Sequence, residues 1–105
     1  MEDMTPQEAH AAWTAGDIVI VDVREQNEHD ATRIPGVPLL PMSELMERID
    51  ELPEAPLAII CRSGRRSAQV ADYLNATGER EAANLEGGII GWAAAGLPYE
   101  GEPPR

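Results

Sequence analysis

Two short, unbroken apolar runs constrain the fold of this 105-residue chain more than any other feature. Ile18–Val23 consists of β-branched residues interrupted only by Asp22, and Leu57–Ile60 is apolar throughout. Neither run alternates apolar with polar residues, as a strand with one solvated face would. Continuous runs of this length are typical of strands covered on both faces, as in a parallel sheet. The sequence therefore predicts a sheet buried between two layers.

Helix signals lie before, between and after these runs. Thr5–Glu8 forms a capping box with Pro6 in the first helical position, and Gly16 is a candidate C-terminal cap. Ser43 is expected to cap a helix that ends before Pro53, with an apolar stripe made by Leu45, Met46, Ile49 and Leu52. Further helices are expected over residues 24–33, from residue 66 and over residues 89–95, and a third strand within residues 80–85.

Strands that alternate with helices along a chain are typical of α/β proteins. We therefore expect a three-layer α/β/α fold with a mostly parallel central sheet. The sequence contains no internal repeat and no linker-like stretch, so residues 1–105 are expected to form one domain. Its last residues, 101–105, are expected to be a loose polar tail.

The charge balance excludes several classes of partner. The chain has eight Arg, no Lys and 19 acidic residues, for a net charge of -11. Such a surface repels phosphate backbones, so nucleic acid and anionic membranes are not expected as partners. The first residues are acidic and no long apolar segment follows them. We therefore expect neither a secretory signal nor a membrane span, and a cytoplasmic location.

Cys61 is the only cysteine of the chain. An internal disulfide is therefore impossible, and one cysteine with two His does not supply an ordinary zinc site, so no metal is expected. A single thiol is either an inert core residue or a reactive group. Cys61 directly follows the second apolar run, at the carboxyl end of a predicted strand, where open α/β sheets bind their ligands.

The residues after this cysteine favour a reactive thiol. The turn Cys61–Ser67 leads into a helix, so its backbone N–H groups and the positive helix end can face one centre. Arg62, Arg65 and Arg66 add positive charge, although we expect one of them to be only a solvated surface cation. Residues 55–71 carry a charge of +3, whereas the other 88 residues, with five Arg and 19 acids, carry -14. We expect this positive pocket to lower the pKa of the thiol and to favour small anions.

Four segments, taken in order, carry motifs of one known family. They are Asp22-Val23-Arg24 with the later acid Glu28, Arg33-Ile34-Pro35-Gly36-Val37, the turn Cys61–Ser67, and Leu85-Glu86-Gly87-Gly88 with Trp92 and Gly96-Leu97-Pro98. Together they resemble the rhodanese-type sulfurtransferases, and the resemblance covers residues 4–99. It departs from the family pattern at Arg33, where the family has His, and at His29, where an aromatic residue often follows the acid.

The resemblance implies a rhodanese-like fold and a chemistry. The Cys61 thiolate would attack the outer sulfur of thiosulfate or of a persulfide donor and carry that sulfur as a persulfide. A thiol, cyanide or a thiol-bearing protein would then accept it, and no cofactor is implied. Asp22 and Arg24 would support the loop. The loop itself would bind the small anionic donor through Arg62, Ser63, Gly64, Arg65, Arg66 and Ser67.

Two alternatives stay open. A cysteine phosphatase or arsenate reductase also holds a thiolate in an anion-binding loop, but its signature is one residue longer than the interval from Cys61 to Arg66. A sulfur-carrier or docking module with little thiosulfate activity is the second alternative. The sequence leaves open the donor, the acceptor, the oligomeric state and which loop Arg contacts the substrate.

Overall fold

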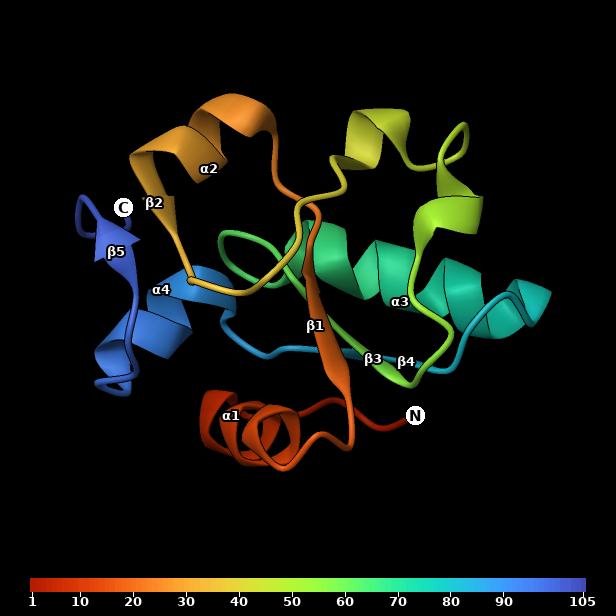
Figure 1. Ribbon diagram of the computed structural model, residues 1–105, viewed down its shortest axis with the longest axis horizontal. Helices are drawn as coiled ribbons and strands as arrows, with labels where there is room; N and C mark the ends of the chain where they lie inside the picture. The colour runs from red at the N-terminus through yellow and green to blue at the C-terminus, as the bar shows by residue number, and fades with distance from the viewer.

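The computed structural model describes residues 1–105, and a parallel sheet lies at its centre (Figure 1). The sheet contains β1 (Val19–Asp22), β3 (Leu57–Ile60) and β4 (Ala82–Asn84), in the order β1-β3-β4. Every residue of these strands except Val19 is buried. The expected α/β fold with a mostly parallel central sheet is confirmed, and the two apolar runs form two neighbouring strands of that sheet.

Helices cover both faces of the sheet (Figure 1). One face carries α1 (Pro6–Thr14) and α4 (Gly88–Ala94), and the other carries α3 (Arg65–Thr77). Successive strand residues alternate between the two layers. Ile20 and Ile60 belong to the apolar cluster on the α1 and α4 side, whereas Val21 and Ile59 belong to the cluster on the α3 side. This two-sided burial explains why the strands read as continuous apolar runs.

Local signals at both ends of the chain are also found in the structure. The Glu8 N–H donates to Thr5 Oγ1 at 3.1 Å and the Thr5 N–H donates to Glu8 Oε1 at 2.9 Å, so the expected capping box begins α1. Trp92 of α4 is buried, donates its Nε1–H to the Pro98 carbonyl at 2.8 Å and packs edge-on against Trp13. None of the helices combines the length and apolar composition needed to cross a membrane.

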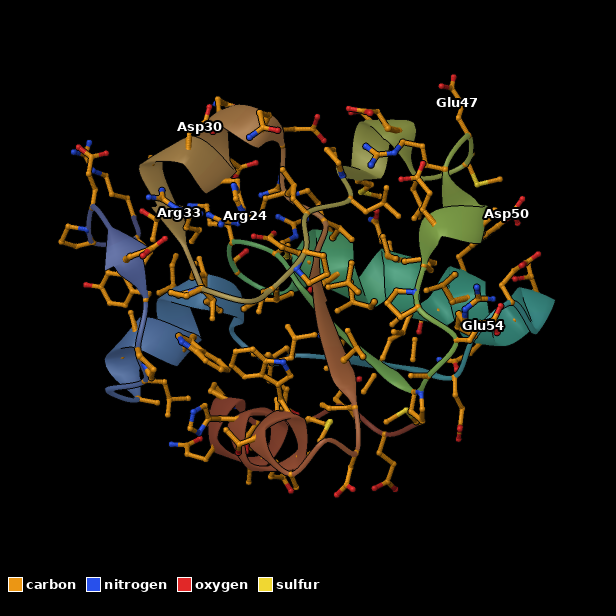
Figure 2. All side chains as sticks on the ribbon, viewed as in Figure 1. Arg24, Asp30, Arg33, Glu47, Asp50 and Glu54 are labelled. Carbon is orange, nitrogen blue, oxygen red and sulfur yellow. The ribbon has the colours of Figure 1, made fainter.

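The segment 43–52 does not form the helix expected there. Two short 3-10 turns stand in its place: η1 (Met42–Glu44), which begins one residue earlier, and η2 (Ile49–Glu51). Ser43 does not cap a helix, because its hydroxyl donates to Glu25 Oε1 at 2.6 Å. Of the expected apolar stripe, Leu45 and Leu52 are buried, whereas Met46 is 64% exposed. Met42 and Ile49 are partly buried and also pack against the apolar cluster on the α3 side, whereas Figure 2 shows the acidic side chains of Glu47 and Asp50 pointing outward from the segment.

The C-terminal residues are not the loose tail expected from their composition. β5 (Glu100–Gly101) pairs antiparallel with β2 (Thr32–Arg33), which follows α2 (Gln26–Ala31). The Glu102 N–H donates to the Ala31 carbonyl at 2.7 Å. Gly101 has φ +93°, and a Cβ there would lie 2.3 Å from the same carbonyl oxygen, so only glycine permits this close approach. A two-residue pairing has no periodicity, so hydrophobic patterning could not have predicted it.

Candidate active site

Cys61 directly follows β3, and the loop from Cys61 to Gly64 leads into the first turn of α3. Gly64 has φ +100° and precedes the helix. A Cβ at this position would lie 3.3 Å from the backbone nitrogen of Gly87, so glycine lets the loop pass close to the start of α4. The strand–turn–helix setting predicted from the sequence is therefore present at the carboxyl edge of the sheet.

Backbone contacts with α4 fix the direction of the loop peptides. The Ile89 N–H donates to the Cys61 carbonyl at 2.8 Å, and the Ile90 N–H donates to the Arg62 carbonyl at 3.2 Å. Gly88 lies against these two carbonyls, since a Cβ there would be 2.4 Å from the Arg62 oxygen. Because the loop carbonyls are bound to α4, the following N–H groups are left to face the sulfur.

The Cys61 sulfur is surrounded by hydrogen-bond donors from Gly64 and Ser67. We call the sulfur together with these two residues the cradle. The side chain of Cys61 is buried, and its Sγ lies 3.1 Å from the Gly64 nitrogen and 3.2 Å from Ser67 Oγ. Burial alone would raise the pKa of this thiol. The Ser67 hydroxyl and the N–H groups of Ser67, Gly64 and Ser63 outweigh that cost and hold the pKa below its ordinary value.

The lowered pKa of Cys61 agrees in direction with the expectation from the sequence, which named the backbone N–H groups of the turn, the positive end of the helix and the charge of three arginines. The groups that lower the pKa of the thiol are neutral hydrogen-bond donors of the loop and of Ser67, and no arginine is among them. The arginines do not form one cluster of free charge. We call Arg62, Arg65 and Arg66 the rim, and each of them has different surroundings.

Arg66 is paired with a carboxylate. Its Nη1 and Nη2 lie 2.6 and 2.8 Å from the two carboxylate oxygens of Glu28, which comes from α2. The hydrogen bonds from Arg66 lower the pKa of Glu28 to about 2, and the same pair raises the pKa of Arg66. A bidentate pair of this kind cancels most of the charge that Arg66 brings to the pocket.

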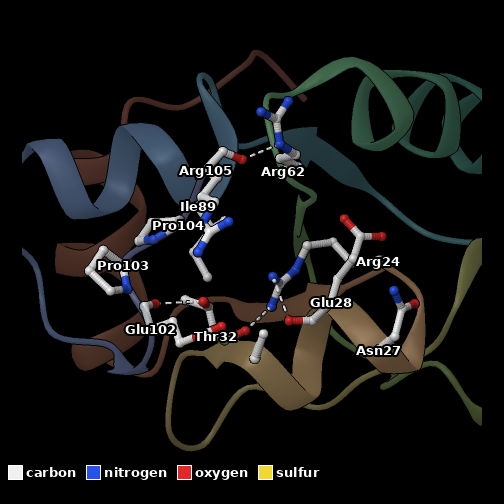
Figure 3. A pocket seen from close by; sticks show the side chains of 11 residues that line it. Arg24, Asn27, Glu28, Thr32, Arg62, Ile89, Glu102, Pro103, Pro104 and Arg105 are labelled. Carbon is white, nitrogen blue, oxygen red and sulfur yellow. Dashed lines mark hydrogen bonds between the residues drawn. The ribbon is translucent and has the colours of Figure 1, made fainter.

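The other two rim residues are exposed. The Nε–H of Arg62 donates to the main-chain oxygen of Arg105, a contact visible in Figure 3. The side chain of Arg65 forms no hydrogen bond or ion pair, so Arg65 is the unpaired cation of the rim.

The buried pair Asp22–Arg24 lies at the end of β1, beside the end of β3, and both residues are 3% exposed. Arg24 Nη2 lies 2.8 Å from Asp22 Oδ2 and also donates to the Thr32 carbonyl at 2.6 Å, while Nη1 donates to the Glu28 carbonyl at 3.3 Å. The pair therefore fastens β1 to α2 and β2. Its link to the loop is indirect, because it passes through the Glu28–Arg66 contact.

Asn84 is a site residue that the sequence analysis did not single out. It ends β4, is 8% exposed, and its Oδ1 lies 2.6 Å from Ser67 Oγ. A signal was available, because Asn84 is a polar residue at the carboxyl end of a predicted strand, directly before the Leu85-Glu86-Gly87-Gly88 motif. A buried amide at such a position needs a polar partner.

A cleft of about 380 Å³ opens beside the loop (Figure 3). Its walls come from α2 with β2, from Arg62 of the loop, from Ile89 of α4 and from the tail segment 102–105. The charged residues of the lining are Arg24, Glu28, Arg62, Glu102 and Arg105, so the walls carry both signs of charge. The cleft gives a small, charged molecule room next to the rim. The structure contains no cluster of His, Cys, Asp or Glu suited to a metal ion.

Comparison with known proteins gives a consistent result. The family profile described as Rhodanese-like domain matches residues 5–95. A sulfurtransferase of Allochromatium vinosum is 42% identical over 83 residues, which cover 78% of this chain and 78% of that protein. YrkF of Bacillus subtilis, named as a candidate sulfur carrier protein, is 39% identical over 74 residues, which cover 70% of this chain and 40% of that protein. The solved structure of a rhodanese-related protein from Thermoplasma volcanium superposes with a TM-score of 0.86 at 28% identity, covering 97% of this chain and 100% of that one.

Proposed function

This chain belongs to the family of rhodanese-like domains and has sulfurtransferase relatives, and from this premise we propose that it transfers a sulfane sulfur through a persulfide on Cys61. The observation that carries the proposal is the cradle. A single sulfur with a lowered pKa faces several N–H and O–H donors and needs no adjacent general base. The same donors are suited to the negative terminal sulfur of a persulfide.

The reaction has two displacement steps. The Cys61 thiolate attacks the outer sulfur of thiosulfate, the sulfur–sulfur bond of the donor breaks with its electron pair, and sulfite leaves. With a persulfide donor, a thiolate leaves instead. An acceptor thiolate or cyanide then attacks the terminal sulfur of the persulfide. The bond between the two sulfurs breaks, and its electron pair returns to Cys61 as the thiolate.

We assign the first contact with an anionic donor to Arg65, because it is the rim cation without a partner. Arg62 lines the neighbouring cleft and is placed to hold donor oxygens after releasing the Arg105 main chain. Arg66 is a weaker candidate for this role, since its guanidinium fork is occupied by Glu28.

The phosphatase and arsenate reductase alternative is less favoured. The arginine that would hold a tetrahedral oxyanion in such an enzyme corresponds to Arg66, which is bound to Glu28. The sulfur carrier alternative keeps the same Cys61 persulfide and differs only in the acceptor, which would be a thiol-bearing protein. The similarity to YrkF favours keeping it as the second candidate.

The test is the intact mass of the protein after incubation with thiosulfate or with a small-molecule persulfide donor. We expect the mass of one sulfur atom to be added, and the Cys61→Ser variant to show no addition. Addition of cyanide or a thiol should then remove the extra sulfur. If neither donor adds sulfur, the proposed function is wrong, and hydrolysis of a phosphate monoester without sulfur transfer would favour the phosphatase instead. Sulfur that is loaded but passes only to a protein thiol would identify a carrier.

A further inference from the structure

The Ser67 hydroxyl has one proton and two neighbours that could accept it. Ser67 Oγ lies 3.2 Å from Cys61 Sγ and 2.6 Å from Asn84 Oδ1. A hydroxyl donates one hydrogen bond at a time and accepts through its lone pairs. With the proton on the short contact to Asn84, the contact with the sulfur is satisfied only if the Cys61 thiol donates to Ser67 Oγ. The orientation of Asn84 with Oδ1 toward Ser67 therefore satisfies all three groups only when Cys61 is a neutral thiol.

The thiolate needs the opposite direction. A sulfur without a proton can only accept, so the Ser67 hydroxyl has to turn toward Cys61. The oxygen of Ser67 would then face Asn84 Oδ1 at 2.6 Å with no proton between them, which is an unfavourable contact of two acceptors. A half-turn of the Asn84 amide removes this conflict, because it places the donor Nδ2 against Ser67 Oγ.

The structure leaves Asn84 free to make this turn. Its Nδ2 forms no hydrogen bond with the rest of the chain, so no partner is lost when the amide reverses. Asn75 provides the contrast within the same molecule. Its Nδ2 donates to the Ala71 and Ala82 carbonyls at 2.9 and 2.7 Å, and its Oδ1 accepts from the Ala82 N–H at 3.0 Å, so its amide is fixed in one orientation.

We propose that Asn84 is a positioning residue whose amide reverses when Cys61 ionises, so that Ser67 accepts from the thiol and donates to the thiolate. When the thiol loses its proton to water, the Ser67 O–H bond rotates, so that the hydroxyl stops donating to Asn84 Oδ1 and donates to the sulfur. The proton stays on Ser67 Oγ, and this oxygen now accepts a hydrogen bond from Asn84 Nδ2. Asn84 thus acts on the nucleophile through Ser67, without touching the sulfur. The inference rests on the proposed role of Cys61 as a nucleophile, and it concerns only the ionisation of that residue.

The test measures thiolate formation by its ultraviolet absorbance as a function of pH, with Cys61→Ser as the blank. Asn84→Asp keeps the size of the side chain but presents only acceptors, so the Ser67 hydroxyl stays turned away from the sulfur. We expect Asn84→Asp to raise the titration midpoint of Cys61. The rise should be about one pH unit larger when Ser67 is present than when the same change is made in Ser67→Ala. Equal shifts in both backgrounds would mean that the new carboxylate acts only by its charge, and the proposal would fail.

The other charges near Cys61 are the same in all four proteins of this double-mutant cycle, so their effects on the midpoint cancel in the comparison. They are Arg66 with Glu28 and Glu25, the Asp22–Arg24 pair at the end of the neighbouring strand, and the rim residues Arg62 and Arg65. Asn84→Ala adds a second check, because it removes the competing acceptor without adding charge. Its midpoint should stay within a few tenths of a unit of the wild-type value, whereas a rise as large as that of Asn84→Asp would contradict the proposal.

A measurement on the unaltered side chain keeps the proposal testable if Asn84→Asp does not fold. The side-chain amide resonances of Asn84 should shift with pH at the midpoint of Cys61, and should lose this shift in Cys61→Ser. The Asn75 amide is the internal control and should not follow that midpoint. Asn84 resonances that stay constant while Cys61 ionises would overturn the inference. None of these measurements depends on sulfur transfer, so a failure here is distinct from a failure of the proposed function.

Discussion

The cradle and the rim occupy the same short loop but contribute in different ways. The cradle is buried and holds the sulfur through neutral donors at 3.1 and 3.2 Å. The rim carries all the formal charge of the loop, yet Arg66 is paired with Glu28, and Arg62 and Arg65 are exposed. We propose that the two parts serve different steps: the cradle sets the ionisation state of the Cys61 thiol, and the rim binds the charge of the donor.

The largest expected effect comes from breaking the support of the cradle. Gly88→Ala would place a Cβ 2.4 Å from the Arg62 carbonyl oxygen at φ +60°, so the loop or α4 has to shift. We expect a loss of at least about 2 kcal/mol in the free energy of unfolding, measured with urea, and a raised pKa of Cys61.

Gly96→Ala is the matched control for this change. Gly96 also has a positive φ, +77°, but a Cβ there would meet no atom within 4 Å. Its substitution should cost only the left-handed conformation, about 1 kcal/mol, and leave the pKa of Cys61 unchanged. If both variants behave alike, the close contact of α4 with the loop carbonyls has no special importance for the cradle.

Removal of a cradle donor should change the ionisation of the sulfur more than removal of a rim charge. In Ser67→Ala the sulfur loses the largest of the contributions that lower its pKa, so we expect the pKa of Cys61 to rise by about one unit. Arg65→Ala should leave it nearly unchanged, because the exposed Arg65 makes no contact with the sulfur. Thiolate absorbance against pH measures both, and a larger effect from Arg65 would reverse the division between cradle and rim.

Removal of a rim charge should change the reaction rate according to the charge of the donor, with little effect on the ionisation of Cys61. Thiosulfate carries two negative charges, whereas methanethiosulfonate presents the same outer sulfur with one. Arg65→Ala should lower kcat/KM for thiosulfate by about tenfold, which corresponds to about 1.4 kcal/mol, and lower it less for methanethiosulfonate. Rates of sulfite and sulfinate release measure the two reactions. Equal losses with both donors would show that Arg65 has no role in charge selection.

The difference between cradle and rim also marks how far the sequence could predict this site. The apolar runs and the turn after Cys61 depend on local patterning, and they indicated the sheet and the placement of the loop. The charge count around the loop was misleading, because Glu28 is 38 residues from Arg66 in the sequence. A distant partner can cancel a local charge without any trace in the local composition.

Two other features depended on tertiary contacts in the same way. The segment 43–52 has helical spacing, but Ser43 binds Glu25, and of the expected stripe Leu45 and Leu52 are buried while Met46 is exposed. Asn84 and Ser67 meet because β4 lies beside β3, which hydrophobic patterning alone does not specify. Sequence therefore predicted the strands of the central sheet and the position of Cys61 at the end of one of them, whereas the partners of individual polar side chains had to come from the structure.

The smallest expected effect concerns the ion pair between Glu28 and Arg66, which neutralises one of the three rim cations. The pKa of Glu28 is about 2 in the folded protein, below its ordinary value of 4.5, so the folded state favours the ionised carboxylate. Its contribution to stability is complete above pH 4.5 and is lost as the pH falls toward 2. Glu28→Gln should therefore flatten the dependence of the free energy of unfolding on pH in that window. The difference at neutral pH should be no more than about 1 kcal/mol, because both side chains are partly exposed. Urea unfolding at a series of pH values tests this, and Glu8→Gln, which changes another carboxylate of lowered pKa far from the loop, is the control for general acid effects.

The same variant tests whether Glu28 limits the charge of the rim. If Glu28→Gln raises kcat/KM for thiosulfate but not for methanethiosulfonate, the carboxylate limits the positive charge available to a dianionic donor. An unchanged ratio of the two kcat/KM values would mean that Arg66 contributes nothing to the rim even when it is unpaired.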